Sequence, residues 1–167
     1  MMSRLSSLLF ALALAAPGAF AHDYTDGSVH IDHPWSRPTP PGTPMGVGYM
    51  ALKNNGKESV ILIGAQSPRA GHISIHESSM KDGIMRMQPV SGGLVIPPGK
   101  TVKLQPHSYH LMLENLNAPL KPGERIPVIL QFDGAESISV ELAVEPMDGG
   151  AQDGAMKMEH SSHGMAQ

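Results

Sequence analysis

The segment Tyr109-His110-Leu111-Met112-Leu113 alternates apolar side chains with potential metal ligands, and the fold prediction starts from it. Residues two apart in a β-strand share a face. Tyr109, Leu111 and Leu113 therefore form one apolar face, which we expect to lie in a core. His110 and Met112 share the opposite face, away from that core.

Two other segments repeat this arrangement. In Ile73-Ser74-Ile75-His76, the histidine lies on the polar side of the strand, and in Ile84-Met85-Arg86-Met87 two methionines share a face. Asp82-Gly83 between these segments is typical of a two-residue hairpin turn. Imidazole and thioether groups suit a soft, low-valent ion such as Cu(I). The pattern predicts a solvent-facing site in which at least one methionine accompanies the histidines near the surface.

Each of these side chains also has an ordinary structural interpretation. Methionine commonly fills irregular gaps in cores. A single histidine on a strand is usually a surface residue or a hydrogen-bonded one. The grouping of two histidines with two methionines on neighbouring strands nevertheless favours a metal site.

The spacing of these residues resembles that of the PCu(A)C copper chaperones of the bacterial periplasm. The pattern of that family is a His, ten residues, a Met, about twenty-one residues and then H-x-M. His76 and Met87 are separated by ten residues, and Met87 and His110 by twenty-two. The additional residue fits the turn around Ser91-Gly92-Gly93, where an insertion is well tolerated.

The resemblance extends over roughly residues 28–145 and has several implications. It implies that His76, Met87, His110 and Met112 bind one Cu(I). It implies a cupredoxin-like Greek-key β-barrel or sandwich. It also implies delivery of copper to the CuA subunit of cytochrome oxidase, with a Sco-type protein as a further partner. The landmarks that carry it, besides the ligands, are P-W-S-R-P-T-P-P-G (34–42), G-Y-M-A-L-K-N-N-G (48–56), D-G-I-M-R-M-Q-P-V (82–90) and Y-H-L-M-L (109–113).

The rest of the chain independently predicts an all-β domain, because short strand patterns alternate with Gly- and Pro-containing turns. We expect Asn55-Gly56 to turn a hairpin. We expect Trp35 in the core, as the only tryptophan of the chain. No helix of ten residues or more is expected after the first 21 residues. The expected strands cover residues 46–53, 59–65, 73–77, 94–96, 101–104, 109–113, 125–132 and 137–144.

Residues 1–21 have the features of a secretory signal peptide. Arg4 precedes a short apolar run, residues 8–16, and Ala19-Phe20-Ala21 is a cleavage signal. The apolar run is too short to span a membrane, and the chain has no Cys that could carry a lipid. We expect a mature periplasmic protein that is not inserted in a membrane, with a copper-binding domain over residues 22–146.

Residues 147–167 change in composition and predict a disordered tail. Its His and Met content is nevertheless typical of a metal-binding tract. The tail could hold Cu(II) together with His22, whose amine and ring can chelate one ion, or it could collect Cu(I) for the main site. The alternative function is therefore copper storage or resistance. The candidate ligands of the tail are Met156, Met158, His160, His163 and Met165.

The composition also excludes several classes of protein. The net charge is −3 and no basic run is present, so nucleic acid is not expected as a partner. The absence of Cys excludes a blue-copper centre, which needs a thiolate ligand. No G-x-S-x-G, H-E-x-x-H or P-loop motif occurs, so we expect a binding protein without catalytic residues.

Overall fold

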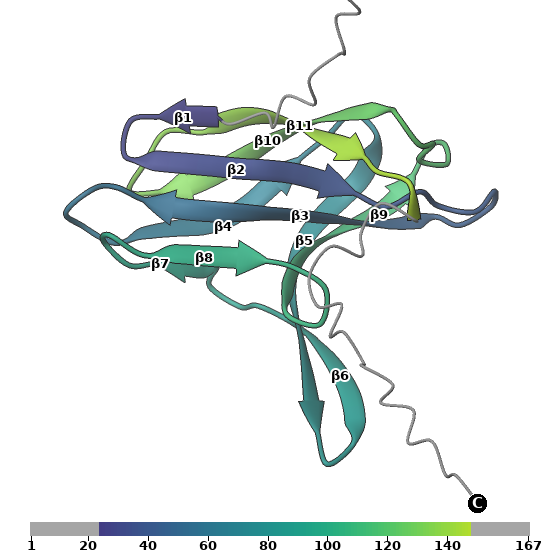
Figure 1. Cartoon of the computed structure of the whole chain (residues 1–167), viewed down its shortest axis with the longest axis horizontal. Coiled ribbons are helices and arrows are strands. Elements are labelled where there is room, and N and C mark those ends of the chain that lie inside the picture. The colour runs from purple at the N-terminus through teal and green to yellow at the C-terminus, as the bar shows by residue number, and fades with distance from the viewer. Residues whose placement is uncertain (1–23, 148–167) are drawn as a thin grey trace, which may run out of the picture.

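The structure is a computed structural model that describes residues 24–147, and this part of the chain contains β-strands and no α-helix (Figure 1). Most strand boundaries lie within a few residues of the predicted ones, and the all-β prediction is confirmed. The strands are β1 (Tyr24–Asp26), β2 (Val29–Ser36), β3 (Met45–Asn54), β4 (Val60–Gln66), β5 (Ala70–Lys81), β6 (Ile84–Pro89), β7 (Leu94–Ile96), β8 (Thr101–Leu104), β9 (Tyr109–Leu116), β10 (Arg125–Asp133) and β11 (Ile138–Val144).

The described strands form one sheet of eleven members that folds over its own core. Its hydrogen-bonded path runs β6-β5-β9-β8-β3-β2-β11-β10-β4-β7, and β1 pairs with β2. Most neighbours are antiparallel, whereas β2 pairs with β11, and β8 with β9, in parallel. The path does not close between β7 and β6, so the sheet is open and β6 lies at one of its ends.

The core is built from the inner faces of alternating strands. On β11 the buried residues are Ile138, Val140, Leu142 and Val144, and the residues between them point outwards. Leu111 and Leu113 of β9 join the same hydrophobic cluster and are fully buried, as their alternation predicts. Because Leu111 and Leu113 of β9 face the core, the side chains of His110 and Met112 project from the other face of the strand.

The predicted hairpin at Asn55-Gly56 is wrong. Strand β3 pairs with β2, β8 and β9, whereas β4 pairs with β10 and β7. Neither Asn55 nor Gly56 has the positive φ that a two-residue hairpin turn needs. Instead, the side chain of Asn54 accepts the Gly56 N–H at 2.8 Å and donates to the Ile96 carbonyl at 2.9 Å, which fastens the loop to β7.

The prediction that Trp35 lies in the core is also wrong. Strand β2 has a bulge before Trp35, and His33 within it has a φ of 47°. A bulge adds one residue to the strand and reverses the alternation beyond it. Trp35 is therefore half-buried on the outer face, where its ring centroid lies 4.6 Å from that of Tyr49 and 5.8 Å from the Arg37 guanidinium.

The predicted turn at Asp82-Gly83 is confirmed. These residues have φ values of 54° and 76°, as a turn between two adjoining antiparallel strands requires. Strand β5 is twelve residues long, and its second half leaves the body of the molecule together with β6 as a two-stranded ribbon (Figure 1). The base of this hairpin, where His76 pairs with Pro89, lies at the candidate site, and the turn at Asp82-Gly83 lies away from it.

Candidate metal centre

The two predicted histidines form a cross-strand pair. His76 of β5 lies directly opposite His110 of β9, with ring centroids 5.9 Å apart and ring planes at 45°. Further along β9, Met112 lies opposite Ser74. Opposed residues of antiparallel strands project from the same face. The structure therefore brings His76, His110 and Met112 to one face of the sheet.

The fourth predicted ligand comes from β6. Met87 lies opposite Ser78 of β5, which is the next position on the face of His76. The four side chains thus share one face of three adjacent strands, although the segment between Met87 and His110 has one residue more than the family pattern.

The burial of the four side chains differs from the prediction of a solvent-facing site. His110 and Met112 are only 4% and 7% exposed, and His76 is half-buried. Met87 is 50% exposed. Met112 is nevertheless outside the main hydrophobic cluster. This is expected, because its side chain projects from the other face of β9 than those of Leu111 and Leu113. The site is therefore buried on the β9 side and open on the β6 side.

Two ring nitrogens in this pair are buried without a hydrogen-bond partner in the described part of the chain, namely Nδ1 of His76 and Nε2 of His110. Leaving such a group unpaired costs about 1–3 kcal/mol. A neutral imidazole nitrogen is also a common metal ligand. The centroid separation of 5.9 Å leaves room for one ion between the rings, since a metal–nitrogen bond is about 2 Å long.

The backbone of Ser108 orients the His110 ring. His110 Nδ1 donates to the Ser108 carbonyl at 3.1 Å, which leaves the lone pair on Nε2. The same carbonyl accepts the Ser78 N–H at 3.0 Å, so it is held between β5 and the start of β9. A backbone carbonyl that binds the second ring nitrogen is a common support for a metal-ligating histidine. The sequence contained no signal for this contact, because any residue can supply a carbonyl.

No group of three or more His, Cys, Asp or Glu side chains converges within residues 24–147. The next cross-strand pair, Glu77 and Tyr109, faces the other side of the sheet. There, burial and the adjacent Glu77 carboxylate, which accepts a hydrogen bond from the phenol, raise the pKa of Tyr109. The predicted ligands are two imidazoles and two thioethers, and none of them is a carboxylate.

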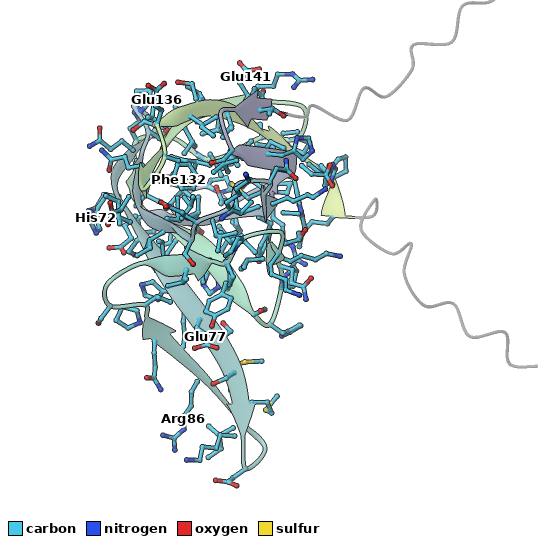
Figure 2. All side chains as sticks on the ribbon, turned by 90° about the vertical axis from the view of Figure 1, so that its left-hand side faces the viewer. His72, Glu77, Arg86, Phe132, Glu136 and Glu141 are labelled. Carbon is cyan, nitrogen blue, oxygen red and sulfur yellow. The ribbon has the colours of Figure 1, made fainter. Side chains whose placement is uncertain are left out.

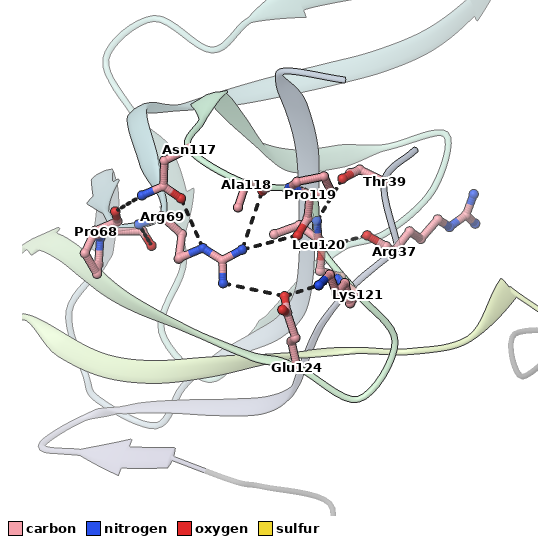
Figure 3. A network of polar contacts seen from close by, with 12 residues as sticks. Arg37, Thr39, Pro68, Arg69, Asn117, Ala118, Pro119, Leu120, Lys121 and Glu124 are labelled. Atoms are coloured by element: carbon pink, nitrogen blue, oxygen red, sulfur yellow. Dashed lines mark hydrogen bonds and ion pairs between the residues drawn. The ribbon is translucent and has the colours of Figure 1, made fainter. Parts of the chain in front are cut away.

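Met112 also lines a groove of about 330 Å³ between β3, β9 and the Pro-rich segment 37–44. This segment is anchored by a reciprocal pair of hydrogen bonds. Thr39 N donates to the Leu120 carbonyl at 3.0 Å, and Leu120 N donates to Thr39 Oγ1 at 2.9 Å (Figure 3). The Pro-rich segment thereby lines the same groove as Met112.

The loop that contains Leu120 is held in turn by Arg69. The Arg69 guanidinium donates to Asn117 Oδ1 at 3.2 Å and to the Pro119 carbonyl at 3.3 Å, and it lies 3.5 Å from the Glu124 carboxylate (Figure 3). The sequence marked the Pro-rich segment as a family landmark but not as a neighbour of Met112. Only long-range contacts place the two along one groove.

Several predicted features lie outside the described residues. These are the signal peptide over residues 1–21, His22, and the tail residues Met156, Met158, His160, His163 and Met165. Within residues 24–147, no helix combines the length and the apolar character that crossing a membrane would need.

The sequence has relatives among known families and proteins. Residues 29–144 match the LpqE-like family, whose description is “Putative lipoprotein LpqE-like”. A similar curated protein is “Putative lipoprotein Lxx21020” of Leifsonia xyli subsp. xyli. It is 33% identical over 121 residues, which are 72% of each chain.

The fold is that of solved PCuAC domains. The copper-bound PCuAC domain from PmoF2 superposes with a TM-score of 0.65 at 24% identity, over 75% of this chain and 98% of that domain. The solution structure of CuI-DR1885 from Deinococcus radiodurans gives a TM-score of 0.52 at 29% identity, over 67% and 74% of the two chains. The cupredoxin-like fold and the family resemblance are therefore confirmed.

Proposed function

The chain belongs to the LpqE-like family, and from this membership and the geometry of its histidine pair we propose that it is a copper chaperone of the bacterial periplasm. The observation that carries the proposal is the pair of buried ring nitrogens without hydrogen bonds, on His76 and His110. Two thioethers, those of Met87 and Met112, lie on the same face.

We assign His76, Met87, His110 and Met112 as the ligands of one Cu(I). Neutral nitrogen and sulfur ligands suit the soft monovalent ion and add no negative charge that would favour Cu(II). The similarity at 29% identity to CuI-DR1885, a protein solved with Cu(I), supports this choice of ion. In this proposal the chain is a carrier and uses no catalytic residue.

The uneven burial of the four ligands suggests an order of release. Met87 is 50% exposed, whereas Met112 is 7% exposed beside the Pro-rich segment. A ligand of an acceptor protein would reach the ion from the side of Met87, displace its thioether first and then exchange with the imidazoles. Copper remains Cu(I) throughout, so the transfer needs no electron donor. Where a Cys thiol of the acceptor becomes a ligand, its proton is released to solvent.

We further propose that the acceptor is the CuA subunit of cytochrome oxidase, with a Sco-type protein as a possible co-acceptor. This proposal rests on the PCu(A)C resemblance alone. The periplasmic location rests on the signal-peptide pattern of residues 1–21 and is in keeping with relatives that are named as lipoproteins.

The test is a titration of the protein with Cu(I) in competition with a chromogenic chelator. We expect one tightly bound Cu(I) equivalent in the unaltered protein. In His76→Ala and in His110→Ala, the Cu(I) affinity should fall by more than the roughly 10–100-fold that is typical when a residue that only supports a metal ligand is replaced. His72→Ala is the matched control, because His72 is exposed and lies on the same face of β5.

The second half of the test is transfer to a soluble CuA domain with Cys ligands, followed by separation of the two proteins and measurement of the copper content of each. Fast transfer of one equivalent supports the chaperone. Tight Cu(I) binding that survives both His→Ala substitutions would contradict the assigned site. It would favour storage of copper on other residues.

A further inference from the structure

The hairpin of β5 and β6 exposes an unusual surface beyond the candidate site. All six residues of β6 are exposed, and the ribbon projects away from the body of the protein (Figure 1). Arg86 lies towards the far end of this ribbon, well away from the body (Figure 2). The side chains of the ribbon therefore have no core to fill.

The two faces of this ribbon differ sharply in chemistry. One face carries Met80, Met85 and Met87, together with Ser78 and Pro89, and contains no charge. The three thioether side chains are 64%, 42% and 50% exposed.

The opposite face of the ribbon holds its charged side chains. The residues there are Glu77, Ser79, Lys81, Ile84, Arg86 and Gln88. A ribbon with water on both sides has no packing reason to separate thioethers from charges in this way, because methionine gains its stability from burial.

The register brings the three methionines close together. Met80 lies directly opposite Met85, where Cβ atoms are typically about 4.5–5.5 Å apart. Met87 is two residues further along β6, about 7 Å away on the same face. A methionine side chain has three flexible bonds, so three sulfur atoms at these spacings can converge on one ion.

We propose that this face of the hairpin is a second Cu(I) site, formed by Met80 and Met85, which Met87 joins as a third thioether while the histidine pair holds no ion. It rests on the proposed function only in that Cu(I) is the cargo. The site binds more weakly than the histidine pair, because it has no imidazole and its ligands are in contact with water. An uncharged set of thioethers selects a soft monovalent cation over divalent ions.

This site has a direct connection to the histidine pair. Three cross-strand pairs follow one another on this face of the ribbon: Met80 with Met85, Ser78 with Met87, and His76 with Pro89. Met87 therefore lies between the two methionines at the tip and His76. Cu(I) captured at the tip can pass to Met87 and then to His76 and His110 by exchange of one neutral ligand for another. No electron is transferred, and thioethers release no proton, so the charge of the ion stays +1 at every step.

An apolar docking surface is the competing explanation for exposed methionines. Substitution by leucine separates the two, since leucine keeps the apolar area and removes the sulfur. Ile84 provides the control. It is 59% exposed on the opposite face of the same hairpin, so Ile84→Leu alters exposed apolar surface without touching the thioethers.

The experiment uses the mature full chain labelled with ¹³C at the methionine methyl groups. The methyl signals are assigned with single Met→Leu variants, those of the tail included. Ag(I) is titrated as a redox-inert substitute for Cu(I), and Cu(I) is then titrated without oxygen. We expect Met112 and Met87 to shift with the first equivalent and Met80 and Met85 with a later one. In Met80→Leu/Met85→Leu, whose own methyl signals are absent, the total number of bound Ag(I) equivalents falls by one, and Ile84→Leu keeps the full number.

The His76→Ala/His110→Ala variant distinguishes this inference from the main proposal. Persistence of the Met80 and Met85 shifts in that variant establishes an independent hairpin site, whether or not the histidine site exists. If these two methyl signals stay fixed while those of the tail move, the hairpin does not bind the ion. That result overturns the inference, even if the first equivalent still binds to the histidine pair.

Discussion

Strands β11 and β9 bury alternate residues in the same core but use their second faces differently. On β11 the outward residues Ser139 and Glu141 are exposed. On β9 the outward residues His110 and Met112 are 4% and 7% exposed. The comparison teaches that alternation determines which side of a strand leaves the core. What packs over that side determines whether it reaches water.

The largest expected effect tests the shared inner face. Leu111→Ala on β9 and Leu142→Ala on β11 each remove a fully buried side chain of the main cluster. We expect each to lower the free energy of unfolding of the copper-free protein by about 2–5 kcal/mol. Urea denaturation measures it. A loss below about 1 kcal/mol for Leu111→Ala would mean that β9 does not face the core as described.

The next effect separates metal binding from packing on the outer face. Met112→Leu keeps the volume of a buried side chain, so we expect a change in stability of less than about 1.5 kcal/mol. Because the thioether is lost, the Cu(I) affinity should fall at least about tenfold, which corresponds to about 1.4 kcal/mol of binding free energy. Chelator competition and thermal unfolding measure the two quantities on one sample.

Met87→Leu is the exposed counterpart of that substitution. We expect a similar loss of Cu(I) affinity with no measurable change in the unfolding transition, since Met87 is 50% exposed. Unchanged Cu(I) binding in both variants would remove the thioethers from the ligand set.

A smaller effect tests whether the Pro-rich segment 37–44 shields Met112 from solvent. Arg69→Ala removes the hydrogen bonds that hold the loop around Asn117 and Pro119, and this loop anchors the Pro-rich segment. We expect a loss of stability of about 1–3 kcal/mol and faster oxidation of Met112 to the sulfoxide by peroxide, followed by mass spectrometry. Arg125→Ala is the control, because its contact with Glu141 on β11 is exposed. Equal oxidation rates in the two variants would show that the segment does not protect Met112.

The smallest effect concerns pH. Burial and the Glu77 carboxylate raise the pKa of Tyr109 above 10.0, its usual value, so the folded state holds the phenolic proton more tightly than the unfolded state does. The resulting stability is present below about pH 10 and is lost as pH rises through the folded pKa. Tyr109→Phe should therefore flatten the decline of unfolding free energy as the pH rises above about 10. An unchanged slope would assign that decline to other groups, such as Tyr49, whose pKa burial also raises.

Much of the site could be predicted from local pattern, and the failures have definite causes. The alternation of β9 placed Leu111 in the core and Met112 outside the main cluster, because side chains of a regular strand alternate whatever the tertiary context. The same rule failed at Trp35, since a bulge at His33 reverses the alternation and the sequence carries no reliable mark of it. Asn55-Gly56 failed as a hairpin because β3 pairs with strands other than β4.

The sequence by itself determined the all-β class, the turn at Asp82-Gly83 and the side of its own strand on which each predicted ligand lies. Each of these depends on neighbours within a few residues. The tertiary structure alone decided that His110 is oriented by the Ser108 carbonyl and that Met112 is buried. The first contact depends on backbone position. Met112 shares a groove with a segment anchored by Thr39 and Leu120, which are 81 residues apart. Contacts over that separation follow from sheet topology and packing, which local alternation does not encode.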